Sequence, residues 1–223
     1  MRNISKITLG LATASLLVVG LAACSAPTST TESSSAPTSD AQPTPVASIP
    51  ALEGVDTQVT LDQGFVDALT TLGLTPGVTG TATLVDGALH FPITGGNVDY
   101  YDPTQSYRPY VQGEIDHDGS GITLTGGDTV VGLSDFKIDP GTSRLTGTVT
   151  ANGTLVANDV FIFNLDGSTL KPLSMDENGD AVLEGTRVLI SSDAAALLNK
   201  TFNTTAVTDT LLVGIAKITA HAK

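Results

Sequence analysis

Tryptophan is absent from this chain of 223 residues, and cysteine and histidine are scarce, with one and three residues. A single cysteine, Cys24, excludes an intramolecular disulfide. Cysteine metal motifs, His-Glu-x-x-His, phosphate loops, Gly-x-Gly-x-x-Gly and Gly-x-Ser-x-Gly are all missing. We therefore expect a non-catalytic protein, and a hydrolase built on paired carboxylates is the remaining enzyme alternative.

Basic residues are also few. Ten Lys and Arg stand against 23 Asp and Glu, which gives a formal net charge of −13. A surface of this sign repels phosphate backbones and anionic lipid headgroups. The composition thus disfavours nucleic acid as a partner, and any attachment to a membrane has to come from another source.

The amino-terminal segment supplies such a source. Arg2 and Lys6 precede an apolar run over residues 7–23, the pattern of an export signal, and this run is too short for a permanent membrane helix. The run ends in Leu21-Ala22-Ala23-Cys24, which resembles the lipobox of bacterial lipoproteins. The resemblance implies cleavage after residue 23 and lipidation of Cys24, with palmitate-like acyl chains holding the protein at the extracytoplasmic face of a bilayer. Ser25 favours the outer membrane if the host has two. The alternative is an ordinary signal peptide with a chance cysteine.

Residues 24–50 form a second segment. Seven Ser, five Thr and five Pro make up 17 of the 26 residues that follow Cys24. Such a composition cannot bury enough apolar surface to offset the entropy of ordering, so we expect a disordered tether.

Residues 51–223 have the composition of a single β-rich domain. Short apolar runs alternate with turn pairs such as Asp86-Gly87, Asp118-Gly119 and Asn152-Gly153. The expected strands are 56–61, 79–85, 88–94, 97–101, 109–116, 121–125, 128–138, 144–150, 153–165, 181–190 and 211–220. This spacing predicts a mainly β fold, a sandwich or flattened barrel.

Two short helices are expected to interrupt the strands. Phe65, Leu69 and Leu72 share one helical face over residues 62–72, with Asp62 placed to cap the start and Gly73 to end the helix. A second helix is expected over 194–202, capped by Ser192-Asp193. Both helices are expected to fill the core.

All four tyrosines fall between residues 100 and 110. Tyr100, Tyr101, Tyr107 and Tyr110, together with Arg108, concentrate amphipathic side chains in one place. Tyrosine and arginine commonly supply binding energy at recognition surfaces. The cluster is therefore our first candidate for ligand binding, and packing around Pro103 and Pro109 is the alternative.

This region also resembles a known family. The stretch Ser106-Tyr107-Arg108-Pro109-Tyr110-Val111 is similar to the Ser-aromatic-Arg-x-Tyr stretch of HtaA-type haem-binding domains. The later 113–119 segment is similar to their Gly-His-containing turn. The resemblance implies a β-rich surface domain in which Tyr110 ligates haem iron and His117 supports it. The tryptophan that those domains carry upstream is missing here.

One acidic segment has part of the pattern of a calcium loop. Asp176, Asn178 and Asp180 alternate as the first ligands of such loops do. Ala181 stands where glycine is required and Arg187 where a bidentate glutamate is required. A polar hairpin turn therefore explains this segment better than a metal site, and Asp116-His117-Asp118 allows the same two interpretations.

The sequence thus predicts a membrane-anchored lipoprotein with a non-catalytic binding domain whose ligand is unknown. Haem uptake and a structural role in the cell envelope are the alternatives.

Overall fold

The structure is a computed structural model, and it describes residues 42–221. Signal, lipobox and Cys24 lie outside these residues. The described residues form one compact unit of thirteen strands, two α-helices and one 3-10 helix. In chain order the elements are β1 (Ala47–Ile49), β2 (Gly54–Leu61), α1 (Gln63–Thr71), β3 (Thr75–Gly80), β4 (Thr83–Val85), β5 (Ala88–Phe91), β6 (Gly95–Tyr100), β7 (Val111–Gly126), β8 (Thr129–Asp139), β9 (Arg144–Ala151), β10 (Thr154–Asp166), η1 (Gly167–Thr169), β11 (Ser174–Met175), β12 (Ala181–Ile190), α2 (Ser192–Thr201) and β13 (Leu212–Ala220).

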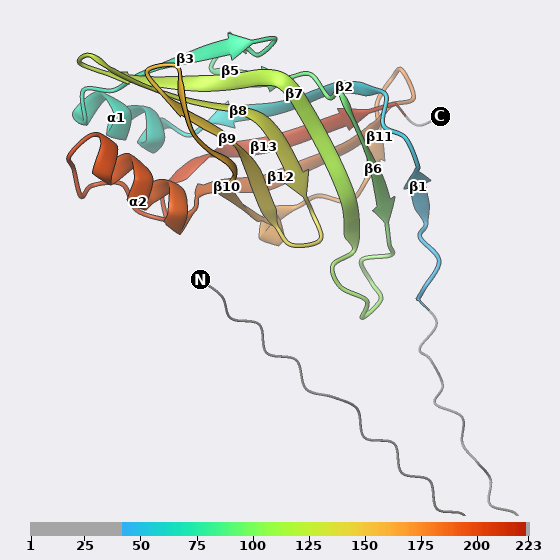
Figure 1. The fold of residues 1–223 in the computed structure, drawn as a ribbon. Coiled ribbons are helices and arrows are strands. Elements are labelled where there is room, and N and C mark those ends of the chain that lie inside the picture. Colours follow the sequence, from blue (N-terminus) through green and yellow to red (C-terminus); the bar gives the residue numbers. More distant parts are fainter. Residues whose placement is uncertain (1–41, 222–223) are drawn as a thin grey trace, which may run out of the picture. The chain divides into compact units, whose positions relative to one another are not determined.

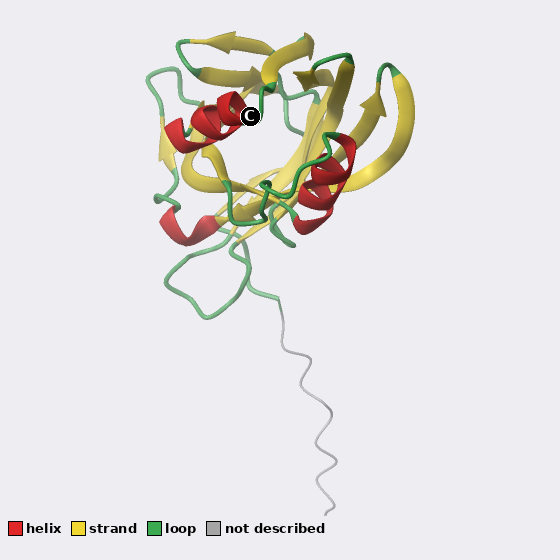
Figure 2. Cartoon of the chain, turned by 90° about the vertical axis from the view of Figure 1, so that its left-hand side faces the viewer, coloured by secondary structure: helices red, strands yellow, loops and turns green. Residues whose placement is uncertain are grey.

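The strands form one antiparallel sheet that curls into a half-barrel (Figures 1 and 2). Its strand order is β1-β6-β7-β8-β9-β10-β12-β13-β2-β5-β4, with β11 beside β12 and β3 beside β7. Most neighbours are consecutive hairpins, and the tight turns explain why. Asp86-Gly87 and Asn152-Gly153 both have positive φ at each residue, as two-residue hairpin turns of type I′ require. The predicted mainly β fold with two short helices is confirmed.

The two helices cover one end of the curled sheet (Figure 2). Asp62 caps α1 by accepting a hydrogen bond from the Gly64 amide, and the chain leaves the helix through Gly73 at φ 66°. The cap of α2 is Ser191, whose hydroxyl accepts from the Ala194 amide. It therefore lies one residue before the predicted Ser192-Asp193. Phe65 and Leu69 of α1 insert into the core, as the helical spacing predicted, and Leu198 of α2 is also buried there.

The core between the helices and the sheet is continuous. Ile162 has no exposed surface, and Val131 and Val149 are 1% exposed. Buried residues alternate with less buried ones along β8 and β9, which is the period-two pattern expected of a sheet with one buried face. On β10 the neighbours Ile162 and Phe163 are both buried.

Several predictions about boundaries were wrong. The expected strand 79–85 is divided between β3 and β4. Asp118-Gly119 is not a hairpin turn, because β7 continues through it as a bulge in which the pairing with β8 shifts between His117 and Gly121. The end of the predicted tether is also ordered. β1 pairs with β6 from Ala47 to Ile49, so the domain begins before residue 51. Backbone hydrogen bonds to an exposed edge strand order this polar segment, which has little apolar surface to bury.

Candidate functional site

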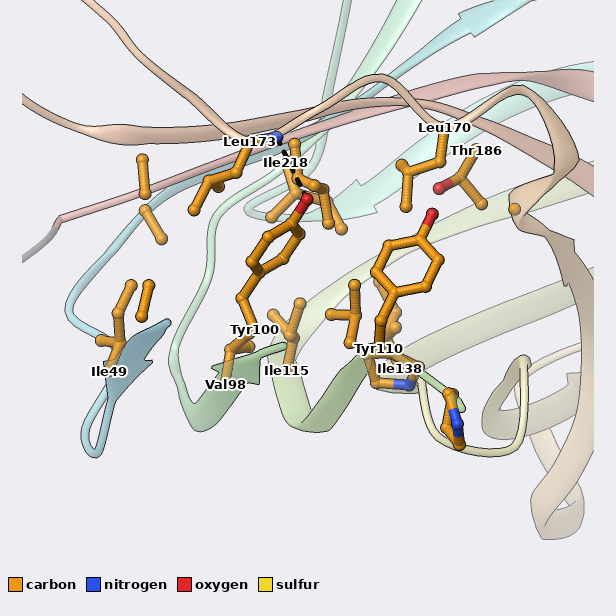
Figure 3. A pocket seen from close by; sticks show the side chains of 18 of the residues that line it. Ile49, Val98, Tyr100, Tyr110, Ile115, Ile138, Leu170, Leu173, Thr186 and Ile218 are labelled. Carbon is orange, nitrogen blue, oxygen red and sulfur yellow. Dashed lines mark hydrogen bonds between the residues drawn. The ribbon is translucent and has the colours of Figure 1, made fainter. Parts of the chain in front are cut away.

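An apolar cavity of about 720 Å³ lies inside the curled sheet, at the end formed by β1, β6 and β11 (Figure 3). Its volume is within the range of small-molecule sites, roughly 300–1,000 Å³. Its lining residues come from both halves of the chain: Ala47, Ser48, Ile49, Leu52, Val98, Tyr100, Arg108, Pro109, Tyr110, Val111, Ile115, Ile138, Pro140, Ser143, Leu165, Gly167, Leu170, Leu173, Met175, Ala181, Leu183, Thr186, Ala216, Ile218 and Ala220.

The chemistry of these walls is uniform. Aliphatic side chains dominate, no aspartate, glutamate or histidine is among the lining residues, and Arg108 is the one charged group. The remaining polar side chains are hydroxyls of Tyr, Ser and Thr. Walls of this kind favour an apolar molecule held by dispersion and by few hydrogen bonds.

Tyr100 and Tyr110 stand next to each other in the cavity (Figure 3). Their ring centroids are 5.9 Å apart and the rings are nearly perpendicular, at 83°. Tyr100 ends β6, and its hydroxyl accepts a hydrogen bond of 3.5 Å from the Leu173 amide. Tyr110 comes just before β7, and its hydroxyl points toward Leu170 and Thr186.

The hydroxyl of Tyr110 remains un-ionised at neutral pH. Burial raises the pKa of this phenol above its ordinary value of 10, the neighbouring Tyr100 raises it further, and Arg108 opposes them. Neither Tyr110 nor Thr186 hydrogen-bonds through its hydroxyl to another residue between 42 and 221. Together they leave unused hydrogen-bonding capacity in an apolar cavity.

Arg108 belongs chiefly to the loop that carries Tyr110. Its guanidinium donates to the carbonyl oxygens of Gln105, Tyr107 and Pro103, at 2.5, 2.7 and 2.8 Å. It also lies 5.3 Å from the centre of the Tyr110 ring, where a cation is attracted by the aromatic face. The residue therefore holds the loop and the Tyr110 ring in place.

The other two tyrosines pack outside the cavity. Tyr101 is 2% exposed, and its ring lies 4.7 Å from that of Tyr107. Its hydroxyl accepts a hydrogen bond from the side chain of Gln42. The predicted cluster thus separates into two cavity residues, Tyr100 and Tyr110, and two residues that pack the loop.

His117 does not line the cavity with Tyr110. It lies within the core on β7, 1% exposed, and it is not a lining residue of the cavity. Its Nδ1 lies 3.3 Å from the carbonyl oxygen of Phe136, and its Nε2 lies 2.8 Å from Oγ1 of Thr57. Burial lowers its pKa to about 4, so the ring is neutral near pH 7.

The acidic turn residues also lie outside the cavity. The carboxylate of Asp176 accepts from the amides of Asn178 and Asp180, and that of Asp180 pairs with His221. The segment is a hairpin turn between β11 and β12. Within 42–221, no group of three His, Cys, Asp or Glu residues is arranged to hold a metal ion.

Half of the cavity could not be found from the sequence. Leu170 and Leu173, in the loop after η1, and Thr186, on β12, face the tyrosines across the cavity (Figure 3). They are ordinary aliphatic and hydroxyl residues, and only the curl of the sheet brings them to Tyr110. No local sequence signal distinguishes them from core residues.

The comparisons with known proteins show a likeness of fold to a solved structure. No family model matches the chain, and no curated protein matches its sequence. The crystal structure of the C-terminal domain of HtaA from Corynebacterium glutamicum is similar, with a TM-score of 0.51 over 78% of this chain and 99% of that chain. The two share 13% sequence identity, so the likeness is one of fold. The predicted resemblance to HtaA-type domains is thus confirmed for the fold alone. In the described part of the chain, no helix has the length and apolar character needed to span a membrane.

Proposed function

We propose that this domain is a non-catalytic binding domain that holds an apolar small molecule in the cavity between Tyr100 and Tyr110. The observation that carries the proposal is the cavity itself, about 720 Å³ with aliphatic walls and no carboxylate or histidine. An apolar cavity of only about 150 Å³ is enough to bind benzene. Such a cavity favours ligand binding over a purely structural role in the envelope.

Uptake of Nile red, an uncharged dye whose emission rises in apolar surroundings, tests the proposal. We expect saturable binding at one site, weakened in Ala216→Phe because the new ring occupies part of the cavity. Ile215→Phe is the matched control, since Ile215 is the neighbouring residue on β13, 37% exposed and not part of the cavity. Equal binding by both variants, with their folds verified by circular dichroism, would place the dye elsewhere and refute the proposal.

Haem is the second candidate, supported by the fold match with the HtaA domain and by the oxygen of Tyr110 in the cavity. Haem supplies an iron that a tyrosine oxygen can ligate. Tyr110 fits this role by its position, although its raised pKa means that a phenolate would have to form on binding. His117 does not fit the supporting role, because it lies in the core with both nitrogens engaged.

Titration with haemin decides between these candidates. A haem site predicts a Soret shift that Tyr110→Phe abolishes and Tyr107→Phe leaves unchanged, since Tyr107 packs against Tyr101 outside the cavity. Absence of a shift, or the same shift in both variants, removes haem as the ligand.

We further propose that lipid on Cys24 holds the domain at the extracytoplasmic face of a membrane. The lipobox supports this, and the cavity-lining strand β1 is where the chain enters the domain. Mass spectrometry of the natural protein should find an acylated Cys24 at the mature terminus. Cys24→Ala should release the protein from the membrane fraction, and an unchanged membrane fraction would contradict the anchor.

A further inference from the structure

We infer that the ligand of the cavity is a long aliphatic chain that ends in one small, uncharged polar group. This inference rests on the proposed function and names the chemical class of its ligand.

The aliphatic lining of the cavity favours a ligand with a hydrocarbon chain. Ile49, Ile138, Leu165, Leu183 and Ile218 come from five different strands and surround the cavity with branched aliphatic groups. The two aromatic rings, Tyr100 and Tyr110, stand perpendicular to each other. These two rings do not form a slot of parallel faces that would select a flat polycyclic ligand, whereas a flexible hydrocarbon chain can follow walls of mixed aliphatic shape. Water finds few hydrogen bonds on such walls.

Two hydroxyl groups in the cavity favour a small polar group at the end of the ligand. Tyr110 and Thr186 point into the cavity from opposite walls, and neither hydroxyl bonds to another described residue (Figure 3). Each can donate one hydrogen bond and accept others. A ligand with a single hydroxyl or carbonyl would satisfy both groups in the absence of water.

The charges disfavour an ionised head. Arg108 is the only charged group in the lining, and three of its donors already bind the carbonyl oxygens of its own loop. A carboxylate would therefore enter an apolar cavity without a dedicated partner, and an unpaired charge there is costly. An ammonium group would find no carboxylate among the lining residues. Because neither a carboxylate nor an ammonium group would find a partner, we expect the polar end of the ligand to be uncharged.

Competition against Nile red with octanol, decanol and dodecanol, supplied from cyclodextrin, tests the chain. Burial of each added methylene should raise affinity by roughly four-fold. Ala216→Phe should reduce this dependence on chain length, because its ring shortens the space open to the chain, and Ile215→Phe should retain it. If Nile red binds in the cavity but affinity does not rise with chain length, the inference fails and the proposed function stands. If Nile red does not bind either, the proposed function fails as well.

The head group has its own test. Tyr110→Phe keeps the ring and removes the hydroxyl, so it should weaken binding of dodecanol by about five-fold, the value of one ordinary hydrogen bond. Binding of dodecane should not change. Dodecanoate at neutral pH should bind more weakly than dodecanol. Equal effects of Tyr110→Phe on dodecanol and dodecane, or tighter binding of dodecanoate, would overturn the proposed role of the hydroxyl and the uncharged head.

Discussion

His117 and Thr57 are hydrogen-bonded across the core, from β7 to β2, with 2.8 Å between Nε2 and Oγ1. The carbonyl of Phe136 can only accept, so Nδ1 carries the proton and donates to it. Nε2 is then the acceptor for the Thr57 hydroxyl. This arrangement defines a neutral imidazole in a fixed tautomer, and it links two strands that are far apart in sequence.

The neutral His117 should make the fold sensitive to acid. Burial lowers its pKa to about 4 from an ordinary 6.5, so between these values the unfolded chain binds a proton that the folded chain does not. Stability should therefore fall as pH decreases from 6.5 to 4, by about 3 kcal/mol from this group. Urea unfolding at a series of pH values measures the slope. His117→Gln keeps an amide that can serve both partners and should flatten the slope, and coincident slopes for the two proteins would contradict the assignment.

Truncation in the centre of the core should be costly. Ile162 has no exposed surface, and Ile162→Ala removes three carbon atoms from close packing. We expect a loss of about 2–5 kcal/mol in the free energy of unfolding, measured by urea denaturation. The control is Leu155→Ala on the same strand, where 56% of the residue is exposed and the loss should be below about 1 kcal/mol. Similar losses at both positions would show that the core is not centred on Ile162.

Much of the fold was predictable because its signals are local. Pairs such as Asn152-Gly153 adopt the positive φ values that their turn type requires, and alternation along β8 and β9 indicates which face is buried. Asp118-Gly119 carries the same signal but lies in a bulge. There the Gly119 amide donates to the carboxylate of Asp135, and the strand continues past it. A bulge and a turn use the same residue types, so the sequence alone could not distinguish them.

The candidate site was predictable only in part. The concentration of tyrosines indicated one wall of the cavity, and Tyr100 and Tyr110 do face it. The opposite wall depends on pairings between distant strands. β12 lies next to β10 and β13, and their curl carries Thr186 across from Tyr110. His117, only seven residues from Tyr110, points instead into the core. Each residue of a strand advances the chain by about 3.3 Å. Seven residues of extended chain therefore place His117 far from Tyr110, although the two are close in sequence.

Glycine at position 113 is required for the wall formed by β6 and β7. Its φ is +120°, and an added Cβ would lie 2.1 Å from the carbonyl oxygen of Asn97 on the paired strand. Gly113→Ala should therefore cost at least about 2 kcal/mol of stability. Gly127→Ala is the matched control, since Gly127 also has positive φ, +57°, but an added Cβ would meet nothing within 4 Å. That variant should lose about 1 kcal/mol. Thermal denaturation compares the two, and equal losses would mean that close approach to β6 is unimportant.

The cap of η1 should control the wall of the cavity that faces the tyrosines. The carboxylate of Asp166 accepts from the Ser168 amide at 2.8 Å and from Arg187 at 2.7 Å, and the hydrogen bonds from Ser168 are the main reason that its pKa is lowered. η1 leads directly to Leu170, which faces Tyr110. Asp166→Ala should remove the cap and the ion pair, and so loosen residues 167–173.

The expected results of Asp166→Ala are weaker Nile red binding and faster amide hydrogen exchange in η1 and the segment after it. Asp62→Ala is a closely matched control, because Asp62 also accepts from an amide two residues ahead at 2.8 Å but caps α1 at the opposite end of the half-barrel. Loss of either cap should destabilise the fold by about 1 kcal/mol. Only Asp166→Ala should change binding, since the order of the η1 segment shapes the cavity and the order of α1 does not. If both variants lost dye binding to the same extent, the cause would instead be the lower stability of the whole domain.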